Sequence, residues 1–219
     1  MAENVFMTVA LRWSITHVYL WKIWPDQLGG GDKFLWAFKD VWVSYNRNLI
    51  KKYAYANNIP PELLAGIAHI EVGGDPTEID IVAFSVRTFD WSGPKWVDDH
   101  LTITKPPAET SFGPVSMQLR TAARTLGKDP DKMTPAQLLS LGLALQRDTY
   151  NLQLAAKHLR DLAEYDFPGT DTRRLSDEQI VVIGSRYNRG MISIEKLKED
   201  LSNGKTVLKR WSRMTKLLK

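Results

Sequence analysis

The stretch PPELLAGIAHIEVGG, residues 60–74, has the features of a short helix that carries an acid into the protein core. The prolines at 60–61 suit a first helical turn, where a missing N–H costs nothing, and the glycines at 73–74 suit the helix end. Four residues fall on one helical face: Leu63, Leu64, Ile67 and Glu71. Because the stretch contains no Lys or Arg, burial of this face also buries a carboxylate without a cation from its own helix.

Burial of Glu71 predicts a particular chemistry. A carboxyl group on an apolar face has a raised pKa, because burial disfavours the charged form. Near neutral pH such a group still holds its proton, as a general acid must. The alternative is that Glu71, next to the terminal glycines, lies at the mouth of the helix in contact with water. On this stretch alone both interpretations stay open.

The composition is that of a globular protein with a core: 219 residues, of which 43% are hydrophobic and 25% charged. There is no cysteine, which excludes disulfides, thiolate nucleophiles and thiolate zinc sites. We expect no metal or organic cofactor, because the histidines lack the spacing of metal ligands: His17, His69, His100 and His158. The net charge of +4 suits an anionic polymer, but phosphate-binding glycine motifs are absent, and we expect no nucleic-acid partner.

The sequence predicts no transmembrane helix, and its apolar first segment and basic last segment have other interpretations. No apolar run reaches the roughly 18 residues that a transmembrane helix needs. The apolar segment 1–24 is interrupted by Arg12, His17 and Lys22 and lacks a cleavage site, so we interpret it as a packed helix and not as a signal peptide. The basic segment 203–219 could hold an anionic wall or membrane, but a solvated helix packed by one apolar stripe is favoured.

Helical periodicity dominates, and we expect one mainly α-helical domain. The predicted helices cover residues 3–24, 33–57, 61–71, 114–126, 138–165 and 176–187, with two more from 193 to the end. Thr134-Pro135 and the capping box Ser176-Asp-Glu-Gln179 mark helix starts. Residues 73–111 interrupt the pattern; a connection this long is usually functional, and its β-branched pairs could form a small β-hairpin.

Two further stretches complete an ordered pattern with Glu71. SFGPVSMQLRTAARTLG covers residues 111–127, and RYNRG covers residues 186–190. An acid at a helix end, then S-x-G with M-Q-L and T-A, then Y-N-x-G, resembles the soluble lytic transglycosylase family. These are lysozyme-like enzymes, related to the goose type, that cleave peptidoglycan. The resemblance spans residues 61–190.

The resemblance implies a lysozyme-like single domain. Residues 59–192 would form the catalytic core, with residues 73–111 as an insert that is long for the family. Residues 1–58 would pack on this core as an N-terminal helical region, and the basic helices of residues 193–219 would belong to the same domain. We expect a monomer.

The resemblance also implies roles for single residues. Glu71 ends a helix of the family form P-x-L-[LA]-x-[AG]-I-x-x-x-E and would be the catalytic acid. Five residues would bind the sugar in the cleft, the tyrosine hydroxyl lying near the acid: Ser111, Met117, Gln118, Tyr187 and Asn188. Val115 stands where the family usually has Gly, which predicts a narrower cleft floor or a different backbone path.

Each of these roles has a structural alternative. Met117 could fill the core, and Ser111 could cap a helix that begins at Pro114. The segment Asn188-Arg-Gly190 could simply end a helix.

The insert decides the reaction mechanism. An enzyme of the lytic transglycosylase family uses one carboxyl group, first as acid and then as base, and forms a 1,6-anhydro product. A hydrolase needs a second carboxylate, about 5–5.5 Å away as a nucleophile or about 6.5–9.5 Å away to activate water. The candidates in the insert are Glu78, Asp80 and Asp90, with Trp91 as a sugar platform; solvated loop charges are the alternative for each acid.

The sequence therefore predicts a lytic transglycosylase or muramidase that cuts the bond between N-acetylmuramic acid and N-acetylglucosamine and lyses bacteria. The alternative is a non-catalytic wall-binding or assembly module that keeps the cleft. Because the substrate lies in the periplasm or cell wall and no signal peptide is found, we expect delivery as an antibacterial toxin of the type VI effector kind, or by a phage lysis route as an endolysin. A toxin predicts two further partners, an immunity protein and a component of the secretion machine.

Overall fold

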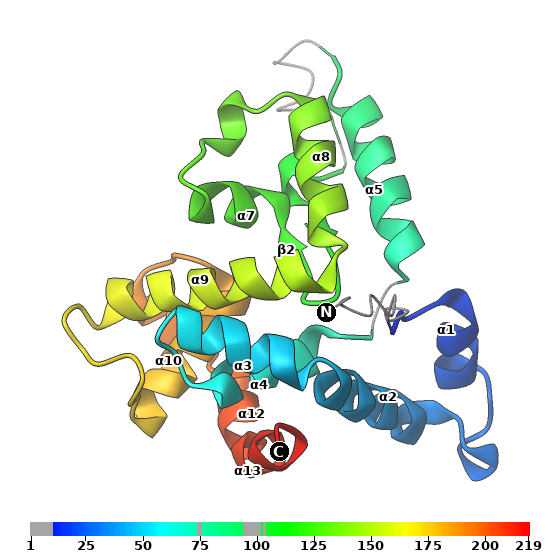
Figure 1. Ribbon diagram of the computed structural model, residues 1–219. Helices are drawn as coiled ribbons and strands as arrows, with labels where there is room; N and C mark the ends of the chain where they lie inside the picture. Colours follow the sequence, from blue (N-terminus) through cyan, green and yellow to red (C-terminus); the bar gives the residue numbers. More distant parts are fainter. Residues whose placement is uncertain (1–10, 74–75, 94–101, 103) are drawn as a thin grey trace, which may run out of the picture.

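The computed structural model describes residues 11–73, 76–93, 102 and 104–219 and is mainly helical, as the sequence predicts (Figure 1). Its α-helices are α1 (Ile15–Lys22), α2 (Gly31–Tyr45), α3 (Arg47–Ala56), α4 (Pro61–Glu71), α5 (Thr77–Asp90), α7 (Leu119–Thr125), α8 (Pro135–Leu145), α9 (Asp148–Asp166), α10 (Asp177–Arg189), α11 (Ile194–Lys198), α12 (Ser202–Lys209) and α13 (Trp211–Leu217). Short 3-10 turns are η1 (Asp26–Leu28), η2 (Pro107–Glu109) and η3 (Pro130–Lys132). Strands β1 (Ser111–Phe112) and β2 (Met117–Gln118) pair antiparallel, with Ser111 opposite Gln118.

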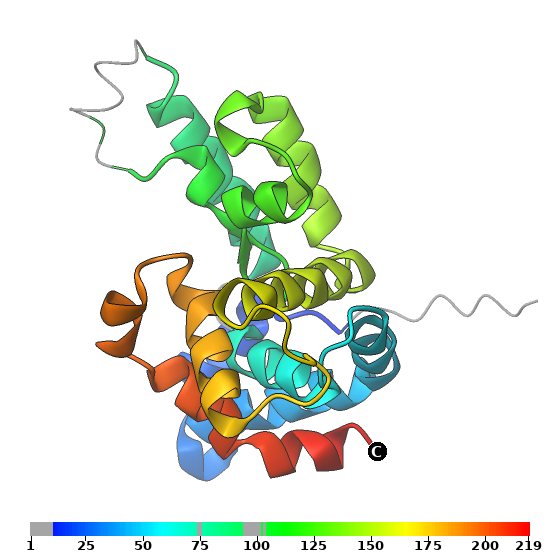
Figure 2. The same ribbon diagram turned by 90° about the vertical axis from the view of Figure 1, so that its left-hand side faces the viewer.

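The helices form two groups that meet along α9 (Figures 1 and 2). The upper group contains α5, α7 and α8 with the two strands, and α7 and α8 both contact α9. The lower group contains α2, α3, α4, α10, α12 and α13, and α1 packs against α2 at its side.

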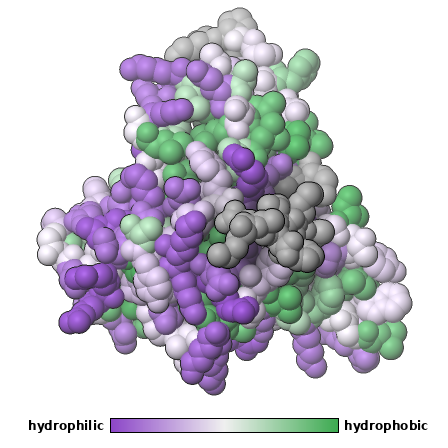
Figure 3. Space-filling view, viewed as in Figure 1, coloured by the Kyte–Doolittle hydropathy of each residue, from purple (hydrophilic) through white to green (hydrophobic). Residues whose placement is uncertain are grey.

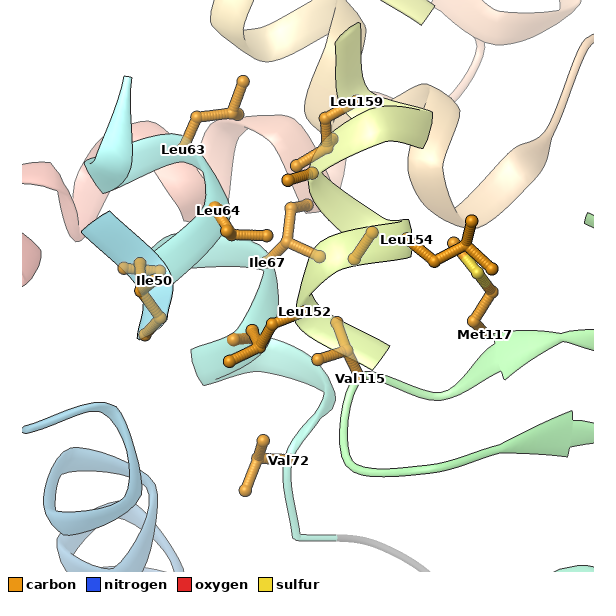
Figure 4. Close-up of a cluster of buried hydrophobic side chains, with 14 of the residues drawn as sticks. Ile50, Leu63, Leu64, Ile67, Val72, Val115, Met117, Leu152, Leu154 and Leu159 are labelled. Carbon is orange, nitrogen blue, oxygen red and sulfur yellow. The ribbon is translucent and has the colours of Figure 1, made fainter. Parts of the chain in front are cut away.

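Helix α4 forms the centre of the lower group. It packs against α2, α3, α9, α10, α12 and α13, and every residue at positions 63–69 is buried. Figure 4 shows Leu64 and Ile67 of α4 beside Leu152 of α9 in the main core cluster. The sequence predicted one buried face of this helix, whereas the structure buries it on all sides. Glu71, the last residue of α4, therefore lies at the end of a tightly packed helix.

Two predicted helices are each divided in the structure. Segment 33–57 breaks at Asn46, which is buried and whose side-chain nitrogen donates to the carbonyl of Trp42 at 3.2 Å. An asparagine that bonds its own backbone competes with the helical ladder. Segment 138–165 breaks at Arg147, whose backbone is extended (φ −86°, ψ 122°).

The start of α7 differs from the prediction because a hairpin precedes it. Residues 113–116 form a tight turn between β1 and β2, with positive φ angles at Gly113 (78°) and Ser116 (44°). The helix predicted from residue 114 therefore begins only at Leu119. The small hairpin expected within residues 73–111 lies instead at residues 111–118.

The front part of the insert is helix α5 and not a hairpin. Phe84 is buried and packs on Phe112 of β1, with ring centroids 6.1 Å apart. This tertiary contact outweighs the weak preference of the β-branched residues for strands. Other apolar side chains of α5 are exposed: Ile79, Val82, Val86 and Phe89. Figure 3 shows apolar surface over the upper group of helices.

The helix-start signals are confirmed at two places. The side chains of Thr134 and Ser176 accept hydrogen bonds from the backbone N–H groups of Gln137 and Gln179, and both form capping boxes. At the N-terminus the helix begins only at Ile15, and residues 3–10 of the predicted helix lie outside the described residues.

The C-terminal segment forms three short helices, α11, α12 and α13, where two were predicted. The chain leaves helical geometry between α12 and α13 at Arg210 (φ −95°, ψ 1°). None of the helices in the described part of the chain is long and apolar enough to cross a membrane.

Candidate active site

Glu71 lies where two pockets meet. The larger pocket, of about 470 Å³, is lined by residues of β2, α7, α9 and the end of α10. The smaller, of about 100 Å³, lies between the N-terminal segment, α2 and the turn at residues 113–116. Glu71, Ser111 and Ser116 line both pockets, so the two pockets adjoin at these residues, and together they are referred to as the groove.

The carboxyl group of Glu71 has a pKa near neutral pH. Burial among protein atoms raises its pKa from 4.5 to about 7, and the positive charge of Lys39 opposes this increase. Part of the residue still faces the groove. A carboxyl group that keeps its proton near pH 7 and reaches a pocket meets the two requirements of a general acid.

Lys39 of α2 is the cation whose charge acts on the Glu71 carboxyl group, and the sequence motifs do not identify it. Its side chain is 3% exposed, and its Nζ donates to the carbonyl oxygen of Ile70 at the end of α4. Burial lowers its pKa to about 8, which the charge of Glu71 opposes. The sequence does contain a signal: Lys39 falls on the buried face of α2, between Leu35 and Trp42.

Replacing Lys39 by Met is expected to raise the pKa of Glu71 above about 7, because the charge that favours the carboxylate is lost while the burial remains. The methionine has a similar length and suits a buried position. The measurement is a titration of the Glu71 side-chain carboxyl carbon by NMR. Lys33→Met, on the exposed side of the same helix, is the control. An unchanged or lowered pKa in the Lys39 variant would contradict the assigned interaction.

A polar network behind Glu71 fixes the end of α4. The Nε2 atom of His69 lies 2.8 Å from Asp40 Oδ1, and Arg210 donates to its Nδ1 at 2.9 Å. Since Arg210 can only donate, Nδ1 is the acceptor, and the ring is neutral with its hydrogen on Nε2. Burial also lowers the His69 pKa to about 4. His69 thus joins α4 to α2 and to the junction of α12 and α13.

The larger pocket brings together the residues that the motifs single out. Ser111, Met117, Gln118, Tyr187 and Asn188 all line it with Glu71. They come from three separate parts of the chain: the strand pair, the end of α10, and the end of α4. The structure therefore joins three ordered but distant motifs in one groove.

Tyr187 lines the larger pocket together with Glu71. Burial raises its pKa well above 10, and the charge of Glu71 adds to the effect, so the phenol stays protonated. Its hydroxyl donates to the carbonyl oxygen of Val115 at 2.9 Å. The Val115 side chain is fully buried beside Leu152 and lines neither pocket (Figure 4). The Val115 side chain therefore does not narrow the groove, and the Tyr187 hydroxyl holds the backbone at this position.

The structural alternatives for the motif residues have different outcomes. Ser111 lies in β1 and caps no helix, because α7 begins at Leu119. Met117 is 2% exposed and belongs to the core while also lining the pocket. Gly190 does end α10 (φ 73°), and the exposed Asn188 just before it lines the pocket.

Among the candidate second carboxylates, Asp80 lines a pocket together with Glu71. Asp80 lines the smaller pocket, and its Oδ2 accepts a hydrogen bond from the Gly113 N–H at 3.3 Å. Glu78 lies in the first turn of α5, and its side chain is outside the described part of the structure.

Asp90 and Trp91 lie at the other end of α5 and line neither pocket. Ten residues of helix separate Asp80 from Asp90, which corresponds to about 15 Å along the axis. The indole nitrogen of Trp91 donates to the carbonyl oxygen of Thr104 at 2.9 Å. Within the described residues, no group of three or more His, Asp or Glu side chains is arranged to hold a metal ion.

The N-terminal segment forms one wall of the smaller pocket. Leu11, Arg12 and Trp13 line it, and Arg12 Nη1 makes a 2.7 Å ion pair with the buried Asp148 at the start of α9. Burial raises the pKa of Asp148, and Arg12 opposes this increase. The ion pair therefore ties the segment to the start of α9.

No family model, curated protein or solved structure matches the chain. The geometry of the groove and the motif pattern are thus the basis for a functional proposal.

Proposed function

We propose that this protein cleaves peptidoglycan glycan strands at the β-1,4 bond between N-acetylmuramic acid and N-acetylglucosamine, with Glu71 as general acid and base. The observation that carries the proposal is a carboxyl group with a pKa near 7 at the point where two pockets meet. The convergence of SFGPVSMQL and RYNRG on the same groove supports it.

The reaction begins with proton transfer. Protonated Glu71 gives its proton to the glycosidic oxygen as the bond from that oxygen to C1 of the muramic acid breaks, so the second sugar leaves as an alcohol. The Glu71 carboxylate then accepts a proton from the nucleophile that attacks C1. If the nucleophile is the 6-hydroxyl of the same muramic acid, the product is a 1,6-anhydro sugar. If it is water, the product has an ordinary reducing end.

Asp80 distinguishes the two outcomes. The 6-hydroxyl route needs only Glu71, whereas hydrolysis needs a second carboxylate beside the sugar. Asp80 lines the same small pocket as Glu71, while Asp90 does not reach the groove. In a hydrolase, Asp80 would therefore be the nucleophile or the base that activates water.

Mass spectrometry of fragments released from purified sacculi tests the proposal. Anhydro ends, together with an active Asp80→Asn variant, identify a lytic transglycosylase. Reducing ends that carry one added water, together with an inactive Asp80→Asn variant, identify a hydrolase. Asp90→Asn is the control and should behave as the parent. Binding to sacculi without release of any soluble fragment would contradict the proposal and favour a non-catalytic wall-binding module.

A further inference from the structure

The end of the larger pocket that lies between α7 and α10 is rich in positive charge. Apart from Glu71, its charged lining residues are three arginines and one acid: Arg120, Arg124, Arg189 and Asp161. Asp161 is already paired with Lys157 at 2.7 Å, one turn earlier in α9. Because Arg120 is itself paired with Glu109, the arginines of this end that form no ion pair with a described residue are Arg124 and Arg189.

The side-chain amide of Gln118 has N–H groups available for a ligand at this end of the pocket. Arg120 Nε donates to Gln118 Oε1 at 2.9 Å, and Arg120 Nη1 forms a 2.7 Å ion pair with Glu109. A guanidinium has donors only, so the oxygen of the Gln118 amide must face Arg120. The amide nitrogen, for which no bond to another described residue is found, keeps two N–H groups for a ligand. Gln118 thus presents donors to whatever occupies the groove.

Arg124 is the cation that is free to meet a ligand. It lies one turn after Arg120 on the same face of α7, is exposed, and has no ion-pair partner among the described residues. Arg189 differs, because its Nη1 donates to the carbonyl oxygens of Lys196, Leu197 and Asp200. Those contacts hold Arg189 in place, and its charge already interacts with the carboxylate of Asp200.

We propose that Arg124 and the amide nitrogen of Gln118 form a binding site for a carboxylate of the stem peptide that muramic acid carries. The inference rests on the proposed function, since it concerns the same groove. A guanidinium binds a carboxylate through two parallel N–H bonds, and an amide N–H adds a third donor. The sugar units between stems are neutral, so the stem peptide is the part of this substrate that supplies carboxylates. Arg120, held by Glu109, positions Gln118 for this contact.

Binding measurements in a Glu71→Gln background test the site without turnover. The ligands are soluble glycan strands with intact stems, strands with amidated stem carboxylates, and strands stripped of peptide whose freed lactyl carboxyl groups have been amidated. We expect intact stems to bind about five- to tenfold more tightly than stripped strands, as for one charge-assisted contact. Arg124→Gln should bring this ratio close to one, as should amidation of the ligand. Arg124→Lys should keep part of it. Arg174→Gln, an exposed arginine outside the pocket, is the control.

The outcomes separate this inference from the proposed function. If the strands bind but the ratio is one, or if Arg124→Gln leaves the ratio unchanged, the carboxylate site is wrong and the groove assignment stands. If amidated and intact stems bind equally, the stem is recognised by something other than its charge, which also overturns the site. If none of the three ligands binds, the proposed function fails and the stem site fails with it.

Discussion

Replacing Glu71 by Gln is expected to slow the release of soluble fragments from sacculi by at least about 100- to 10,000-fold, the usual contribution of a general acid. The amide has the shape of the carboxyl group but no proton of suitable acidity to give to the glycosidic oxygen. The measurement is the rate of clearing of purified sacculi at pH 6, where most of the parent Glu71 is protonated.

The matched control is Glu62→Gln in the first turn of the same helix, where Glu62 Oε1 accepts a hydrogen bond from Thr215. This variant should clear sacculi as fast as the parent. A Glu71 variant that retains the parental rate would remove Glu71 from the mechanism.

The same Glu71 variant should gain stability relative to the parent as the pH rises. A carboxyl group whose pKa is raised from 4.5 to about 7 binds protons more tightly in the folded state, so its contribution is complete below pH 4.5 and is lost as the pH rises through 7. Gln has no such dependence. The difference in unfolding free energy should grow in favour of the variant by roughly 2–3 kcal/mol between pH 4 and pH 8. Denaturant unfolding at both pH values measures it, and a difference that does not change with pH would argue against the raised pKa.

Replacing Arg186 by Met is expected to cause the largest loss of stability, about 3–5 kcal/mol, because it leaves a buried carboxylate without its partner. The side chains of Arg186 and Asp166 are 2% and 8% exposed. Two nitrogens of Arg186 donate to the two carboxylate oxygens of Asp166, each at 2.8 Å, and its Nη1 donates to the carbonyl oxygens of Gly190 and Ile192. For a chain of this size the melting temperature should fall by about 6–20 °C.

Arg173→Met is the matched control for this prediction. Arg173 pairs with Asp171 on the surface, where the arginine side chain is 68% exposed, so its loss should leave the melting temperature nearly unchanged. Equal effects of the two substitutions would contradict the assigned role of burial. Because Gly190 and Ile192 line the larger pocket, the Arg186 variant should also lose activity at temperatures where it is still folded.

The helix ends and the acid of the site follow from short stretches of sequence. The proline at the start of α4 and the capping boxes at Thr134 and Ser176 act through neighbouring residues, so the sequence locates those helix starts correctly. The motifs also predicted that Glu71 and Tyr187 belong together, and both line the larger pocket.

Three features could not be read from local patterns, because each depends on a contact between distant parts of the chain. Helix α5 replaces the expected hairpin where Phe84 packs on Phe112. The local pattern places Lys39 on the buried face of α2, but its contact with the end of α4 depends on how the two helices pack. Asp80 lies in the groove because it contacts Gly113 in the turn between the strands, 33 positions later in the chain.

Helix starts, the helical class and the candidacy of Glu71 were thus available from residues within a few positions of each other. The pKa of that acid was not, because it depends on how much protein surrounds the carboxyl group and on a lysine 32 positions earlier in the chain. The same holds for the groove, which exists only when the ends of α4 and α10 and the strand pair come together. Burial and nearby charges shift a pKa according to distance in space, so only the tertiary structure decides which groups affect the pKa of Glu71.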